Sequence, residues 1–232
     1  MKLPDALAEA ERWATEKYLP ALAKGDSLAD EERRAVAQDL ARYTGLPTPL
    51  LMKTNLRMSN RRFAKELLGE QNRVLGLMDG RVAGFDTNPA NPHAEYDPSF
   101  YIQTVPFVAC MNAYMRSDLK FETDLNYEYL SHEVSRSWNW GESGEGYLNE
   151  LRALRRAATE NVQLKLFLAN GLYDLNTSYF ATKYAIAHLG LNPALRGNVR
   201  ARQYPAGHMM YSDPASLKQL SEDVAAFYKD AR

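Results

Sequence analysis

Two side chains that could carry acid–base chemistry, Asp174 and His208, each stand in a loop that follows a predicted strand. A carboxylate that accepts a hydrogen bond from one imidazole nitrogen fixes the tautomer of the ring and stabilises the imidazolium. The other ring nitrogen is then available as a general base. The pair could therefore move a proton for a nucleophile, provided that the fold brings the two loops together.

The elements around the two residues predict that the loops do meet. Residues 164–168 form a short apolar run typical of a buried strand, which the turn dipeptide Asn170-Gly171 should end. A helix is predicted over residues 177–189, and a second, weaker strand over residues 199–204. Two consecutive parallel strands joined by one helix usually lie close in the sheet, and the loops at their carboxyl ends open on the same edge.

Ordinary structural roles remain open for both residues. Asp174 could close an Asx-turn ahead of the helix, where its carboxylate would accept backbone N–H groups. His208 could be a loop histidine whose hydrogen bonds are satisfied locally. The spacing alone does not choose between these roles and the acid–base pair.

Two segments around these residues resemble segments of a known enzyme family. Residues 170–175, NGLYDL, and residues 206–211, AGHMMY, resemble the aspartate and histidine segments of the serine carboxypeptidase family. The likeness extends upstream, through Trp138-Asn139-Trp140 and a helix predicted over residues 147–159, into a region that resembles the helical cap of that family. The resemblance implies an α/β-hydrolase fold, whose triad runs in the chain order Ser…Asp…His. It implies that Asp174 is the triad acid and His208 the triad base.

The nucleophile of the family has no counterpart in this sequence. The family's serine stands in a Gly-x-Ser-x-Gly turn between a strand and a helix. The nearest match is Gly141-Glu142-Ser143-Gly144-Glu145, which has Glu where the last Gly belongs and no apolar strand before it. Ser143 is therefore predicted to lie in a glycine-rich surface loop. The glycine-rich oxyanion loop is also missing, so the chain resembles only the carboxyl-terminal part of such an enzyme.

The predicted fold class is α/β, the carboxyl-terminal part of an α/β-hydrolase fold with few parallel strands and an α-rich cap-like region. The cap-like region is expected over residues 1–160, with a small hairpin around Asp79-Gly80. The βαβα part of the hydrolase core is expected over residues 161–232. Because two strands leave both edges of a sheet unpaired, we expect a complementary amino-terminal half or self-association across the open edge.

The composition and the sequence patterns give no indication of a nucleic-acid or membrane partner. The 28 basic residues nearly balance the 29 acidic ones, so nothing indicates nucleic-acid binding. Residues 1–6 lack a signal-peptide core, and no apolar run reaches membrane-spanning length, so no membrane partner is expected and the compartment stays open. Cys110, the single cysteine, stands in an apolar stretch and is expected to be a small buried hydrophobe.

The remaining polar residues give weaker indications. His93 and His132 have no partners at metal-ligand spacing, so neither a metal nor a cofactor is expected. Arg57, Arg61 and Arg62 form a cluster that is either a solvated basic face or an anchor for a carboxylate.

Taken together, these features predict the carboxyl-terminal part of a serine-type carboxypeptidase-like hydrolase. Asp174 and His208 would contribute to the release of carboxyl-terminal amino acids from a peptide substrate. The alternative is a catalytically inactive chain whose helical portion is a binding or assembly module.

Overall fold

The computed structural model describes residues 2–139 and 149–230. The chain forms two compact units, Met1–Ser99 and Phe100–Arg232, and each is described by itself. The sequence placed the division near residue 160, whereas residues 100–160 group with the later strands. The described residues combine helices with two small two-stranded sheets, which agrees with a mixed α/β class.

The first unit begins with a continuous helical rod that contains a local irregularity. Helix α1 (Leu3–Trp13) passes through a π-helical segment, Ala14–Tyr18, into α2 (Leu19–Lys24). Pro20 has no N–H to donate to the preceding turn, and a wider turn before it avoids the clash with the carbonyl four residues back. The rod therefore continues through Pro20 without a break.

Two further helices complete the core of this unit. Helix α3 (Asp30–Thr44) ends at Gly45, whose φ of 75° lies in the left-handed region that favours glycine, and α4 (Thr48–Lys53) follows. The core consists of buried apolar side chains from these helices and their connections: Ala21, Leu28, Val36, Ala37, Leu40, Leu46, Leu51 and Leu56.

A short hairpin follows α5 (Asn60–Glu66) and is joined to it by a buried ion pair. Strands β1 (Arg73–Leu75) and β2 (Ala83–Phe85) pair antiparallel around Asp79, which confirms the predicted hairpin. Lys65 of α5 donates to the Asp86 carboxylate just after β2 and to the carbonyl of Asn88 at 2.9 Å. The Lys65 ammonium group holds the pKa of the Asp86 carboxyl below its usual value.

The second unit contains all but the first two residues of helix α6 (Pro98–Ser117), followed by α7 (His132–Ser137) and α8 (Leu151–Glu160). The prediction that Cys110 is buried is wrong, because its side chain is exposed on α6. The helix is apolar on nearly every side, with Arg116 its only charged residue, so the sequence does not indicate which side is covered. It also continues through Pro106 without interruption.

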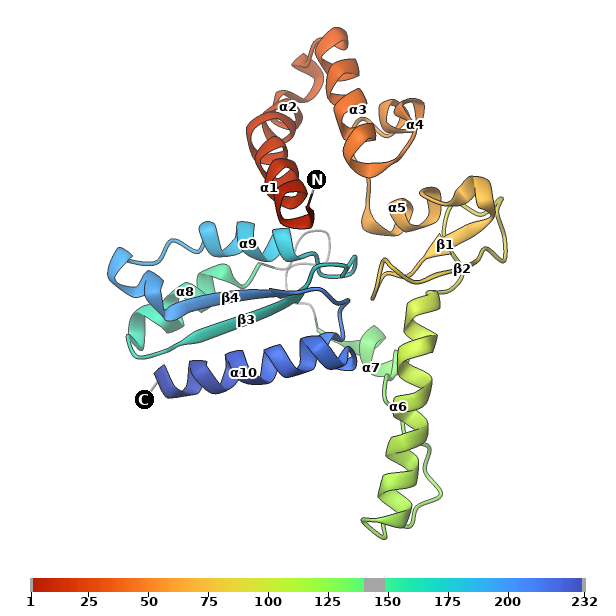
Figure 1. The fold of residues 1–232 in the computed structure, drawn as a ribbon, viewed down its shortest axis with the longest axis vertical. Coiled ribbons are helices and arrows are strands. Elements are labelled where there is room, and N and C mark those ends of the chain that lie inside the picture. Colours follow the sequence, from red (N-terminus) through yellow and green to blue (C-terminus); the bar gives the residue numbers. More distant parts are fainter. Residues whose placement is uncertain (1, 140–148, 231–232) are drawn as a thin grey trace. The chain divides into compact units, whose positions relative to one another are not determined.

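The parallel pair of strands lies between helices in this unit. Strands β3 (Leu166–Gly171) and β4 (Val199–Tyr204) run parallel, in a register that places Leu166 opposite Val199 and Gly171 opposite Tyr204. Helix α9 (Tyr179–Ala187) connects the strands, and α10 (Pro214–Asp230) follows them. In Figure 1, α8 and α9 cover one face of the sheet and α10 covers the other. The Phe167 and Phe227 rings, 5.4 Å apart, join β3 to α10.

The strand β4 was predicted with its observed bounds, but β3 extends further than expected. The Asn170-Gly171 dipeptide, expected to end the strand as a turn, forms its last two residues. Both residues are paired with β4, so the ladder overrides the local turn preference. Within the part of the chain that the structure describes, none of the helices combines the length and the apolar character needed to cross a bilayer.

The buried pair in the first unit gives a test of this fold. Replacing Lys65 by Met should destabilise the unit by about 3–5 kcal/mol, because it leaves the Asp86 carboxylate buried without its cation. The double variant Lys65→Met, Asp86→Leu should recover most of that loss, because no charge then stays buried. Urea unfolding followed by amide hydrogen exchange over residues 60–90 measures both effects. Equal destabilisation by the single and double variants would contradict the buried pair.

Candidate active site

The candidate site lies at the carboxyl ends of β3 and β4, where the ladder continues beyond the strands. The amide of Leu172 donates to the carbonyl of Tyr204 at 2.9 Å, and the amide of Tyr173 donates to the carbonyl of Ala206 at 3.0 Å. These bonds hold the loop after β3 against the loop after β4. The side chains that follow, Asp174 and His208, are therefore placed by backbone pairing rather than by flexible loops.

Gly171 allows this close approach of the two loops. A Cβ atom at this position would lie 2.1 Å from the carbonyl oxygen of Gly207 and 2.5 Å from that of Ala206. Both neighbours are backbone atoms, which cannot rotate away as the end of a long side chain could. The loop that bears His208 can therefore lie against β3 only because residue 171 has no side chain.

The predicted meeting of Asp174 and His208 is confirmed by the structure. The Nδ1 atom of His208 lies 2.8 Å from the Oδ2 atom of Asp174. The Asp174 side chain is almost fully buried, whereas 38% of the His208 side chain stays exposed. A carboxylate can only accept, so Nδ1 carries the proton in this bond and Nε2 is the unprotonated nitrogen of the neutral ring.

Asp174 also closes the turn that leads into α9. Its Oδ1 atom accepts the backbone N–H of Asn176 at 2.8 Å and that of Thr177 at 2.9 Å. The Asx-turn and the contact with His208 therefore exist together. One carboxylate oxygen binds the loop and the other binds the imidazole, so the loop fixes the direction of the bond to His208.

Thr177 is a site residue that the sequence did not single out. Its hydroxyl donates to Asp174 Oδ2 at 2.5 Å, and its oxygen lies 3.1 Å from His208 Nδ1. The hydroxyl thus gives Asp174 Oδ2 a second donor and Nδ1–H a second acceptor, which restrains the ring. The signal in the sequence is the spacing of three residues after Asp174, at which an Asx-turn returns the chain to its carboxylate.

Tyr204 anchors the start of the histidine loop to α10. It is the fully buried last residue of β4, and its hydroxyl donates to Asp223 of α10 at 2.9 Å. Burial raises the pKa of this phenol, so the hydroxyl keeps its proton and the bond to α10. The strand end, the loop and α10 are thereby held together just before His208.

The arrangement can accept a proton at a defined atom. Among the described residues, no group hydrogen-bonds Nε2 of His208, so its lone pair is available to a proton donor from outside this pair. A proton taken up at Nε2 would produce an imidazolium beside the buried Asp174 carboxylate, which stabilises the charge. The site thus pairs a buried carboxylate with an imidazole, and in the part of the chain that the structure describes no hydroxyl or thiol side chain hydrogen-bonds Nε2.

The other residues that the sequence singled out lie elsewhere. His93 is exposed, and His132 is the first residue of α7. Arg57 donates to the carbonyl of Leu22, and Arg62 pairs with Glu66. In residues 2–139 and 149–230, no three His, Cys, Asp or Glu side chains gather so that they could hold a metal ion. Ser143 falls outside the described residues.

Comparisons with models of known protein families, with curated proteins and with solved structures find no match to this chain. The function is therefore inferred from the geometry of the site.

The close approach at Gly171 gives a test that needs no substrate. In the variant Gly171→Ala, the added methyl group should push the histidine loop away, at a cost of about 1–3 kcal/mol. The low-field Nδ1–H proton resonance of His208, expected in the wild type because of the bond to Asp174, should then be lost. Gly197→Ala is the matched control, because a Cβ there meets nothing within 4 Å. A resonance unchanged in Gly171→Ala would contradict the approach.

Proposed function

We propose that this chain supplies the acid and the base of a serine-type carboxypeptidase-like hydrolase, as the carboxyl-terminal part of an α/β-hydrolase fold. The observation that supports this most directly is the 2.8 Å contact between His208 Nδ1 and buried Asp174, at the carboxyl ends of adjacent parallel strands. This edge is where open α/β sheets bind ligands. The resemblance of residues 170–175 and 206–211 to the family's aspartate and histidine segments points to the same chemistry.

The proposed reaction uses His208 in two steps. A serine hydroxyl of a complementary half donates its proton to Nε2 while its oxygen attacks the carbonyl of the last peptide bond of the substrate. Asp174 stabilises the imidazolium that forms, and Thr177 restrains the ring. The imidazolium then gives its proton to the leaving amine, which releases the carboxyl-terminal amino acid. In the second step, a water molecule donates its proton to Nε2 while its oxygen attacks the acyl group. The imidazolium then returns the proton to the serine oxygen, which frees the acyl group.

The two-stranded sheet supports the need for a complementary half. Among the described residues, β3 pairs only with β4, so the outer edge of each strand has no strand beside it. Unpaired edges of this kind are templates for pairing with another chain. In the proposed enzyme, strands of the half that carries the serine would fill one or both edges.

Reconstitution tests this proposal. The chain is mixed with the amino-terminal half of a serine carboxypeptidase, and release of leucine from benzyloxycarbonyl-Phe-Leu is measured. His208→Ala should lower the rate about 10²–10⁴-fold, because the general base is removed. His132→Ala is the matched control, since that histidine begins α7 and is exposed. A folded complex that does not hydrolyse the substrate, or one that is indifferent to His208→Ala, would refute the proposal.

A second candidate function, an assembly module without catalysis, is favoured by α6. Exposed apolar side chains such as Ile102 and Val105 occur on a helix whose only charged residue is Arg116. Apolar surface of this kind marks sites of association. In this reading, the Asp174–His208 pair only stabilises its two loops.

Solution association tests the assembly module. Sedimentation velocity of the wild-type chain should show concentration-dependent dimers or larger species, and Ile102→Lys with Val105→Lys should weaken association about tenfold or more, since it would bury charges without partners. Ala35→Lys with Gln38→Lys, at exposed positions of α3 with the same spacing, is the matched control. A wild-type chain that stays monomeric at all concentrations would contradict self-assembly.

A further inference from the structure

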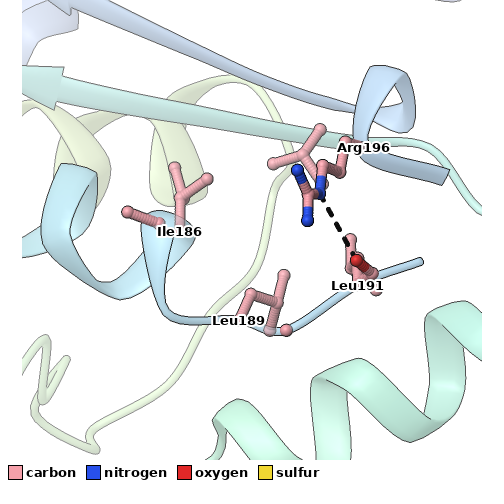
Figure 2. Close-up of a pocket in the computed structure, with 7 residues that line it drawn as sticks. Ile186, Leu189, Leu191 and Arg196 are labelled. Carbon is pink, nitrogen blue, oxygen red and sulfur yellow. Dashed lines mark hydrogen bonds between the residues drawn. The ribbon is translucent and has the colours of Figure 1, made fainter. Parts of the chain in front are cut away.

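A cavity lies at the opposite end of the parallel sheet from Asp174 and His208. It opens where α9 ends and β4 begins, and it encloses about 300 Å³ (Figure 2). This volume is at the lower end of the range for ligand pockets, so it suits a small ligand. The lining residues are Ile186, Ala187, Leu189, Gly190, Leu191, Arg196 and Val199.

The apolar walls of this cavity belong to a packed cluster. Leu189 and Leu191 are buried, and they pack with Ala158 of α8 and with Val199 at the start of β4. Gly190 between them has a φ of 70°, a conformation that a residue with a side chain rarely adopts. The walls are therefore fixed by the core and by a backbone turn.

The polar group of the cavity is the guanidinium of Arg196. Its Nε atom donates to the carbonyl of Leu191 at 3.4 Å, which directs the planar group across the cavity (Figure 2). Among the described residues, its two terminal nitrogens make no hydrogen bond and no ion pair. These two nitrogens form the fork that binds both oxygens of a carboxylate.

A second arginine stands at the same turn. Arg155 of α8 lies over Gly190, with Nη1 3.0 Å from the position that a Cβ there would occupy. No described carboxylate pairs with Arg155 or with Arg196. The carboxyl end of α9 offsets part of this positive charge, but two unpaired guanidinium groups beside one turn favour an anion.

We propose that this cavity binds a monocarboxylate with a short apolar tail. The tail would lie against Ile186, Leu189 and Leu191, and the carboxylate would bind the terminal nitrogens of Arg196, with Arg155 adding positive charge at the rim. Two sources have this chemistry: a free short-chain acid, and the carboxyl terminus of a peptide that ends in an aliphatic residue. The inference does not depend on the proposed function, because the cavity uses none of the residues of the candidate active site.

Titration with small probes tests the site by nuclear magnetic resonance of the full chain. Hexanoate should shift the amide signals of residues 189–191, and 1-hexanol, which lacks the charge, should bind at least about tenfold more weakly. Arg196→Met should weaken hexanoate binding by about tenfold or more. Arg34→Met, at an exposed arginine of α3, is the matched control and should bind as the wild type does.

The outcomes separate the ligand sources and decide the proposal. Binding of N-acetyl-leucine without binding of N-acetyl-leucinamide would assign the site to peptide carboxyl termini, and binding of hexanoate alone would assign it to free acids. If Arg196→Met does not fold, Arg196→Lys gives the same test, because lysine keeps the charge but loses the fork and should bind hexanoate more weakly. Equal binding of hexanoate and 1-hexanol, no response at residues 189–191, or unchanged affinity in the folded Arg196 variant would overturn the proposal.

Discussion

The parallel pairing of β3 with β4 is the constraint on which the candidate site depends. A register that places Gly171 opposite Tyr204 brings the loops after both strands to the same edge, and backbone bonds extend the pairing to Tyr173. A shift of the register by one residue would turn every side chain of β4 to the other face. The absence of a side chain at Gly171 and the bond from Tyr204 to α10 both reinforce this one register. The site is thus held by the sheet.

Within that frame, one buried carboxylate has two tasks that depend on each other. The Asp174 carboxylate is almost fully buried, and burying a charge is unfavourable unless hydrogen bonds replace the lost water. Two backbone amides, the Thr177 hydroxyl and the His208 ring provide four donors, enough for both oxygens. The turn alone would leave one oxygen poorly satisfied. The histidine therefore completes a local structure as well as forming a pair that could carry out chemistry.

The sequence was informative where local signals agreed with the tertiary structure. The bounds of β4, the hairpin around Asp79 and the contact between Asp174 and His208 could be predicted, because periodicity and crossover geometry determine them. The extension of β3 through Asn170-Gly171 could not, since pairing with β4 outweighs the turn preference of the dipeptide. The exposure of Cys110 also escaped prediction, because an apolar helix gives no sign of which side is covered. The contacts of Thr177 and Arg196 depend on the path of the chain, which the residue types alone do not reveal.

The two candidate functions make opposite demands on the same chain. A hydrolase needs the outer edges of β3 and β4 to receive strands that bring a nucleophile to Nε2 of His208. An assembly module needs only that apolar surface such as that of α6 be covered, and it is indifferent to the direction of the His208 ring. Yet the ring is restrained by Asp174 and Thr177 and keeps its outer nitrogen free of hydrogen bonds among the described residues. The hydrolase proposal requires this restraint of the ring, whereas the assembly proposal leaves it without a role beyond stabilising the two loops.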